Sequence, residues 1–161
     1  MVCNSTRILV FLLVLCCSVS AEQKVSVEQL IDAAQRLELH TLRQLLDKDG
    51  GSINQIGPNG DSPLSAAILS KAGVAPEIQR DVVRFLLQKG ADPDLRTGDI
   101  APLELAMLKD VEMVKILLKA GADPLSEAQD GLTPLGTASG LDGEKAEEVR
   151  ALLQAEVDKR K

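Results

Sequence analysis

Hydrophobic residues recur at helical spacing along this chain, and two of the segments that carry them are near copies. The first begins at Val82 and reads Val-Val-Arg-Phe-Leu-Leu-Gln-Lys-Gly-Ala-Asp-Pro. The second begins at Met113, 31 residues later, and seven of its twelve positions are identical to the first. The apolar residues fall three and four positions apart, which places them on one stripe of an α-helix. The pattern predicts a short amphipathic helix that is used more than once.

Each copy also contains the residues that end the helix. Gly90 and Gly121 follow the last apolar position, where many helices end in a left-handed residue that glycine adopts easily. Pro93 and Pro124 come next and prevent the helix from resuming, because proline lacks the N–H group and clashes with the preceding turn. Repetition at a period near 33 residues is typical of a stacked array of helical units.

The two ends of the array are predicted to be less regular than its middle. Residues 26–29 read Ser-Val-Glu-Gln, a capping box that begins a helix. A second helix is expected from about Leu39 and ends at the Asp-Gly-Gly sequence of residues 49–51. At the other end, a helix from about Glu144 has a charged outer face and is predicted to act as a cap. Terminal repeats differ from internal ones because one of their faces has no neighbour.

Proline-containing start signals alternate with these helices. Residues 60–64 read Gly-Asp-Ser-Pro-Leu, residues 131–135 read Gly-Leu-Thr-Pro-Leu, and residues 99–103 follow the pattern more loosely. Ser62 and Thr133 are predicted to cap the N-termini of helices by accepting hydrogen bonds from backbone amides. The proline that follows each of them occupies the first helical position, where a missing N–H group has no effect.

The two alternating signatures resemble those of ankyrin-repeat proteins. The Gly-x-Thr-Pro-Leu signature appears at 60–64 and 131–135, and the Val-Val-x-x-Leu-Leu-x-x-Gly-Ala-Asp signature at 82–92 and, beginning with methionine, at 113–123. The resemblance covers roughly residues 26–158. It implies an all-α fold, a solenoid of stacked helix-turn-helix repeats with short β-hairpin loops. The predicted units are about 26–56, 57–95, 96–127 and 128–158.

Several positions depart from the family pattern. The histidine that usually follows Thr-Pro-Leu is replaced by Ser65, Glu104 or Gly136, so its hydrogen-bonded bridge between repeats is not expected. A carboxylate at Glu104 suits the helix dipole and compensates in part. Ala101 stands where the capping hydroxyl belongs, so the third unit is predicted to lack a cap worth about 1 kcal/mol. The second unit is longer than the others, and residues 70–79 are predicted to extend the turn between its helices.

The N-terminal residues are predicted to be a secretory signal peptide. Ile8–Cys17 is apolar, and Val19 and Ala21 are the small residues that a signal peptidase accepts, so we place cleavage after residues 1–21, before Glu22. The alternative, a membrane anchor that is kept, requires about 20 apolar residues, roughly twice the length of this run.

Cleavage would leave a domain of residues 22–161 with a distinctive composition. All three cysteines lie in the leader, so the domain would contain no disulfide and no Cys-ligated metal. The formal net charge of −6 becomes one unit more negative with the loss of Arg7, and Phe85 is the only aromatic ring besides His40. This composition argues against nucleic acid as a partner and against membrane insertion after cleavage. The lack of cysteines and of Asn-x-Ser/Thr acceptors favours a bacterial periplasm over an extracellular location.

Catalytic, cofactor and metal sites find little support in the sequence. His40 has no nucleophile pattern near it and is interpreted as a surface or turn residue. Asp92, Asp94 and Asp99 share one loop, but Thr97 stands where a calcium loop requires glycine. We predict no catalytic residue, no cofactor and no metal, and therefore a protein that is not an enzyme.

The resemblance implies that the domain binds another protein, as a monomer, through its hairpin tips and the exposed side of each first helix. At the hairpin tips, Ile100 and Leu132 are apolar where the position normally faces solvent, which marks an interface unless they pack on neighbouring hairpins. An alternative function is an inhibitor or immunity-type protein that blocks a toxin or hydrolase in the same compartment. The candidate contact residues are Asn59, Asp61, Leu69, Ser70, Thr97, Asp99, Ile100, Leu108, Lys109, Asp130, Leu132 and Leu141.

Overall fold

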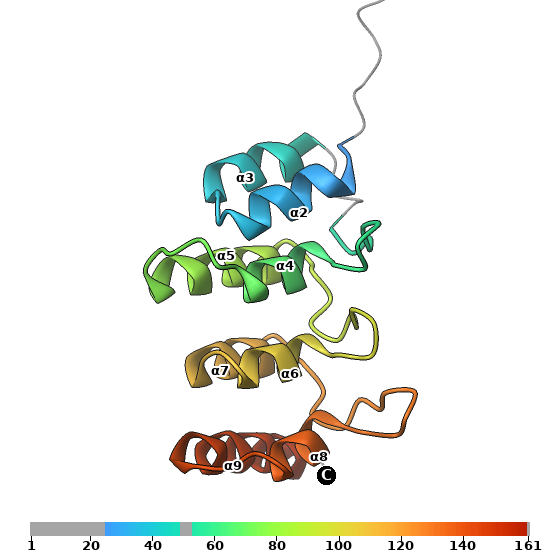
Figure 1. The fold of residues 1–161 in the computed structure, drawn as a ribbon, viewed down its shortest axis with the longest axis vertical. Coiled ribbons are helices and arrows are strands. Elements are labelled where there is room, and N and C mark those ends of the chain that lie inside the picture. Colours follow the sequence, from blue (N-terminus) through green and yellow to red (C-terminus); the bar gives the residue numbers. More distant parts are fainter. Residues whose placement is uncertain (1–24, 49–52, 161) are drawn as a thin grey trace, which may run out of the picture.

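The described chain is a stack of helix pairs joined by loops (Figure 1). The computed structural model describes residues 25–48 and 53–160; the predicted leader and the predicted helix end at 49–51 lie outside them. The helices are α2 (Val27–Gln35), α3 (Leu39–Lys48), α4 (Pro63–Leu69), α5 (Pro76–Gln88), α6 (Pro102–Met107), α7 (Val111–Lys119), α8 (Pro134–Ser139) and α9 (Glu144–Lys159). The all-α solenoid predicted from the sequence is confirmed. In place of hairpin strands, the described residues contain one isolated β-bridge, between Thr97 and Ile100.

The predicted start and stop signals form as expected. The Ser26 hydroxyl accepts a hydrogen bond from the Glu28 amide at 3.2 Å, and the Gln29 side chain accepts one from the Ser26 amide at the same distance. The Thr133 hydroxyl accepts from the Gly136 amide at 3.1 Å. Gly90, after α5, is left-handed with φ 94°. These bonds satisfy backbone groups that helix ends leave unpaired.

The apolar stripes of neighbouring helices meet in one continuous core that runs through the stack. Every pair supplies fully buried large side chains, and alanines on the first helices let successive pairs approach closely. Large and fully buried members of this core include Leu30, Leu42, Leu64, Ile68, Leu86, Leu103, Leu117 and Leu153. The turn between α2 and α3 places Leu37 at φ 58°, a left-handed conformation that is rare for a branched side chain, while burying that side chain.

The extra residues of the second unit are divided between a loop and a helix. Residues 70–75 extend the turn, as predicted, but residues 76–79 form the first turn of α5. The prediction was wrong there because Pro76 begins the helix at its N1 position. The Gln79 side chain donates to the carbonyls of Ala67 and Ile68 at 2.8 Å each, so this added turn is tied to the end of α4.

Polar side chains link each unit to the next. Asn54 donates to the Gly90 carbonyl at 3.0 Å and accepts from the Asp92 amide at 2.8 Å. Asp94 occupies the corresponding position one unit later and accepts from the Asp123 amide at 2.8 Å. Each of these hydrogen bonds fixes the start of one interunit loop against the loop before it.

The second and third units are joined by an additional ion pair. The guanidinium of Arg80, on the added turn of α5, lies 2.6 Å from the carboxylate of Asp110, which caps α7. Both side chains are largely buried, with 22% and 28% of their surface exposed. The ion pair raises the pKa of Arg80.

Glu104 links the third and fourth units and corrects one expectation. At Ala101 the predicted lack of a side-chain cap is confirmed, but the Glu104 carboxylate accepts from the Ala101 amide at 2.7 Å, which is the reciprocal half of a capping box. It also accepts from the Thr137 hydroxyl of the fourth unit at 2.9 Å and pairs with Arg96 at 3.3 Å. The bridge between repeats that was not expected at this position is therefore present, made by a carboxylate.

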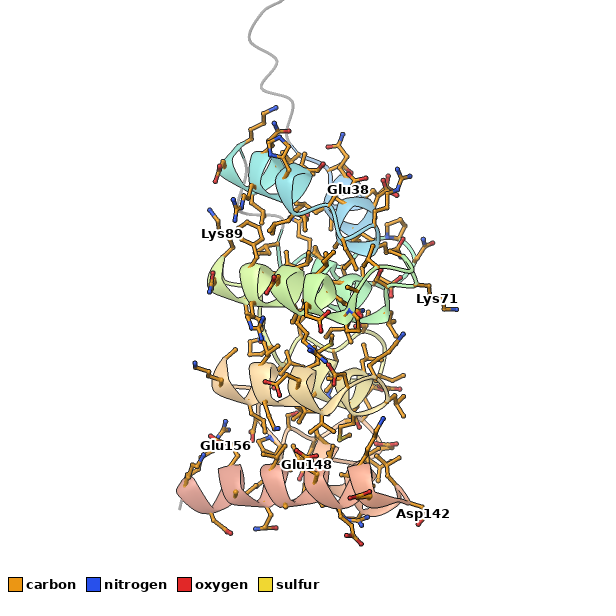
Figure 2. All side chains as sticks on the ribbon, turned by 90° about the vertical axis from the view of Figure 1, so that its left-hand side faces the viewer. Glu38, Lys71, Lys89, Asp142, Glu148 and Glu156 are labelled. Carbon is orange, nitrogen blue, oxygen red and sulfur yellow. The ribbon has the colours of Figure 1, made fainter. Side chains whose placement is uncertain are left out.

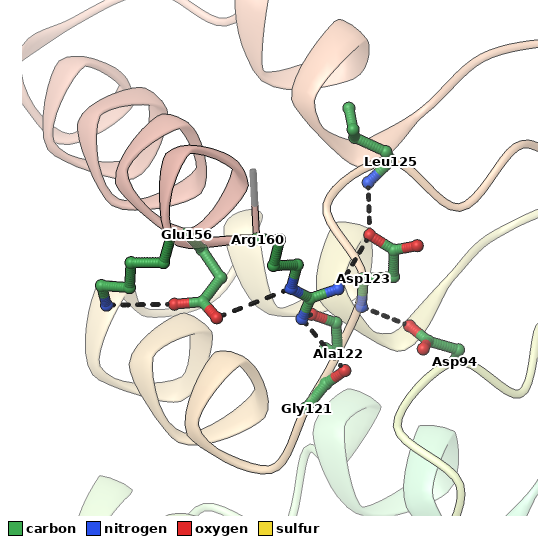
Figure 3. A network of polar contacts seen from close by, with 8 residues as sticks. Asp94, Gly121, Ala122, Asp123, Leu125, Glu156 and Arg160 are labelled. Carbon is green, nitrogen blue, oxygen red and sulfur yellow. Dashed lines mark hydrogen bonds and ion pairs between the residues drawn. The ribbon is translucent and has the colours of Figure 1, made fainter.

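The last helix covers the end of the stack and reaches back to the third unit. Arg160, directly after α9, donates to the carbonyls of Gly121 and Ala122 at 3.3 and 2.9 Å and to the Asp123 carboxylate at 3.1 Å (Figure 3). The predicted cap thus acts partly by satisfying backbone carbonyls that follow α7. Charged side chains such as Lys71, Lys89, Glu148 and Glu156 project from the outside of the stack (Figure 2).

Candidate partner-binding surface

The three loops that join successive units project from the same side of the stack (Figure 1). Each loop leads into a first helix, so loop tips and first helices of neighbouring units border the same hollows. The links made by Asn54 and Asp94 hold the starts of these loops in place, which makes the surface largely preformed.

An apolar hollow of about 330 Å³ lies between the tips of the second and third units. Leu69 at the end of α4 and Ile100 at the loop tip are 40% and 48% exposed, while Leu105 of α6 is buried. We call this site the apolar hollow; its lining residues are Asn59, Gly60, Asp61, Leu69, Thr97, Gly98, Ile100 and Leu105. Five of the residues proposed from the sequence are brought together here.

A second hollow, of about 320 Å³, adjoins the first and has a different character. It shares Asn59 and Asp61 with the apolar hollow, and α2 supplies its other wall, including Glu28 and Asp32. We call it the acidic hollow; its lining residues are Glu28, Ile31, Asp32, Gln35, Pro58, Asn59 and Asp61. Sequence reasoning missed the contribution of α2 because the first unit lacks the family signature. The spacing of Glu28 and Asp32, one turn apart on a helix, is the signal that was available.

Other residues proposed from the sequence lie outside these two hollows. Ser70 lines another hollow, of about 440 Å³, beside the end of α2, where its hydroxyl donates to the Gln35 carbonyl. Leu132 is 53% exposed and Leu108 73% exposed, whereas Leu141 is partly buried. The alternative to an interface was that Ile100 and Leu132 pack on neighbouring loops. Their exposure shows that they do not. Asp99, Lys109 and Asp130 are exposed and do not line either hollow.

Comparison with known proteins agrees with the geometry of the stack. Residues 59–98 and 100–128 match the ankyrin-repeat family. The chain is an ankyrin-repeat protein. Over 127 residues, 79% of its length, it is 31% identical to the E3 ubiquitin-protein ligase Ufd4 of Drosophila melanogaster. The match spans about 4% of that relative, so the similarity concerns the repeat array and not the rest of the ligase. Ankyrin repeats indicate a protein–protein interaction module and are generally not catalytic.

Reactive side chains of this ankyrin-repeat protein are occupied by structural contacts. His40 lies on the exposed side of α3, 3.1 Å from the Gln44 amide nitrogen. The Ser62 hydroxyl is buried and caps α4 through the Ser65 amide. Asp92 accepts a hydrogen bond from the amide of Asp94, within its own turn.

Residues 25–48 and 53–160 contain no group of three or more His, Cys, Asp or Glu side chains placed to hold a metal ion. Within the same ranges, no helix combines the length and the apolar character that crossing a bilayer requires.

Proposed function

We propose that this ankyrin-repeat protein binds a protein partner through the loop tips and the exposed side of its first helices. The supporting observation is the apolar hollow, where Leu69 and Ile100 remain about half exposed between two rigidly held loops. Exposed apolar side chains with a polar rim are typical of interface centres. Preformed loops lower the entropy lost on binding and so favour affinity.

Affinity capture tests this function. The domain is immobilised, incubated with an extract of its native source, and the retained proteins are identified by mass spectrometry. Ile100→Glu and Leu132→Glu should abolish capture, because each places a charge in the proposed apolar contact, while circular dichroism shows unchanged helicity. Ile78→Glu is the matched control: Ile78 on α5 is 45% exposed but lies away from the hollows. Capture that survives both tip substitutions, or that Ile78→Glu removes as well, would contradict the proposed face.

We also propose that the protein is exported, to a periplasm in preference to the extracellular space, and acts there as a monomeric binding module without catalysis. The apolar run Ile8–Cys17 and the small residues Val19 and Ala21 support export. N-terminal sequencing of the protein from the exported fraction should begin at Glu22. An uncut chain retained in membranes would contradict cleavage, and turnover of a substrate that is lost in His40→Ala would contradict the absence of catalysis.

A further inference from the structure

The acidic and apolar hollows form one groove with two chemically different halves. They share Asn59 and Asp61, so a single bound segment can occupy both. The segment must then present one group that suits carboxylates and, a short distance away, one that suits aliphatic side chains. The question is which kind of polypeptide meets both conditions.

The acidic half carries negative charge that neighbouring cations neutralise only in part. Glu28, Asp32 and Asp61 line it, and among the described residues no lysine or arginine lines it with them. Asp32 pairs with Arg36 at 3.1 Å, but both side chains are more than half exposed, so the attraction is weak. Within residues 25–48 and 53–160, Glu28 and Asp61 form no ion pair. In contrast, the carboxylates that link the units, Asp110 and Glu104, are each paired with an arginine.

The walls of the acidic half also suit the stem of a long basic side chain. Ile31 and the Pro58 ring stand among the carboxylates. Lysine and arginine bury their methylene groups against apolar surface while the charged end remains at polar atoms. A divalent cation is a poorer match, because no metal-binding group of carboxylates occurs among the described residues. A lysine or arginine side chain is therefore the complementary group.

The apolar half selects an aliphatic side chain. Its apolar lining is Leu69, Ile100 and Leu105, and it contains no charged group apart from the shared Asp61. Gly60 and Gly98 also line it, and at both a Cβ would meet no atom within 4 Å. Their turns require positive φ, and the missing side chains leave room for the backbone of a bound segment.

An unsatisfied hydroxyl lies in the same wall. Thr97 Oγ1 is buried without a hydrogen-bond partner among the described residues. Buried polar atoms are nearly always paired, so this hydroxyl would gain a partner from a bound segment if the loop tip shifted enough to expose it. The amide groups of an extended polypeptide supply such partners at every residue.

We propose that the groove takes an extended segment of a partner protein in which a lysine or arginine lies within a few residues of a leucine, isoleucine or valine. The basic residue occupies the acidic hollow and the aliphatic residue the apolar hollow. This inference rests on the proposed function and specifies the partner segment that the same face binds.

Selection from a phage-displayed library of random linear peptides tests the inference. The enriched peptides should combine a basic with an aliphatic residue. The tightest is then synthesised with a fluorophore, and its affinity is measured by anisotropy. Glu28→Gln combined with Asp61→Asn should weaken binding about five- to tenfold, since each exposed ion pair contributes up to about 1 kcal/mol, and should reduce its dependence on salt. Glu147→Gln, an exposed carboxylate on α9, is the control and should leave the affinity unchanged.

The outcomes separate this inference from the proposed function. Enrichment of acidic or purely apolar peptides, no enrichment, or binding that the double substitution leaves unchanged would each overturn the inference. The proposed function is judged separately, by capture of the native partner and its loss in Ile100→Glu and Leu132→Glu. The two can also come apart. If capture is lost in Ile100→Glu and Leu132→Glu but is unchanged when Glu28→Gln and Asp61→Asn are combined, the proposed function is supported and the basic–aliphatic segment is refuted.

Discussion

Asp94→Asn is predicted to stabilise the protein, and the reason is visible one unit earlier. Asn54, at the corresponding position, both accepts a hydrogen bond from the Asp92 amide and donates one to the Gly90 carbonyl. The Asp94 carboxylate accepts from the Asp123 amide but has no hydrogen to donate to the Gly121 carbonyl. The Gly121 carbonyl already accepts from Arg160 at 3.3 Å, and an asparagine of the same shape would donate to its second lone pair.

The charge of Asp94 is itself unfavourable in the folded state. Burial raises the pKa of Asp94 above its ordinary value of 3.8, although the hydrogen bond from the Asp123 amide opposes the shift. The neighbouring carboxylates of Asp123 and Asp92 raise the pKa further, and Arg160 lowers it. Asparagine removes the burial penalty and the repulsion but loses the attraction to Arg160. A gained hydrogen bond contributes about 0.5–1.5 kcal/mol, so we expect a net gain of about 1 kcal/mol.

The gain should depend on pH in a defined direction. A carboxyl whose pKa is raised on folding destabilises the folded state only when it is ionised, so the penalty is present above the folded pKa and disappears below 3.8. The stability difference between variant and parent should therefore be largest at neutral pH and shrink as the pH falls through the raised pKa of Asp94 towards 3.8. Protonated aspartic acid also becomes a donor, which narrows the difference further.

Urea denaturation followed by circular dichroism measures this prediction, at neutral pH and in acid. The unfolding midpoint of Asp94→Asn should lie above that of the parent at neutral pH, and the two should converge in acid. Asp99→Asn, an exposed carboxylate in the same loop, is the control and should have little effect at either pH. A variant that is no more stable at neutral pH, or whose advantage grows in acid, would refute this account of the link between units.

Two other positions test buried contacts. Glu104→Ala should lower the free energy of unfolding by about 2–4 kcal/mol, because it leaves the Ala101 amide without its acceptor and Arg96 without its carboxylate. Glu104→Gln keeps a side-chain acceptor and should lower it less. Equal losses in urea denaturation would show that this side chain does not bind the Ala101 amide. Leu37→Ala and Leu37→Gly should both destabilise the protein, because each removes a buried side chain. Leu37→Gly should nevertheless be about 1 kcal/mol more stable than Leu37→Ala, since a φ of 58° strains alanine but not glycine. The opposite order of thermal midpoints would contradict the left-handed assignment.

Local signals account for most of what the sequence predicted correctly. The caps at Ser26 and Thr133 and the left-handed Gly90 involve partners only a few residues away, so their spacing in the sequence determines them. Repetition then placed equivalent positions in register. For that reason the sequence alone predicts that Leu69 and Ile100 share one surface, and both line the apolar hollow.

Contacts between distant residues account for what was missed. Glu104 binds Thr137, 33 residues away, and nothing near either residue indicates that this carboxylate makes the bridge between repeats. The acidic hollow depends on α2 lying beside the loop that contains Asn59 and Asp61, and the irregular first unit gave no register for that comparison. The added turn of α5 was missed because its proline was interpreted as part of a loop.

The links between successive units differ, so each unit is matched to its own neighbours in the stack. Each unit of such an array contacts only its neighbours, so units with identical junctions could be added, removed or exchanged without losing contacts. Here the junctions differ: Arg80 meets Asp110 at one, and Glu104 meets Thr137 at the next. Deleting the third unit would remove Asp110 and Glu104 together and set Arg80 against a unit that evolved with other neighbours. The protein can therefore be lengthened or shortened by whole units only if the junctions are redesigned with them.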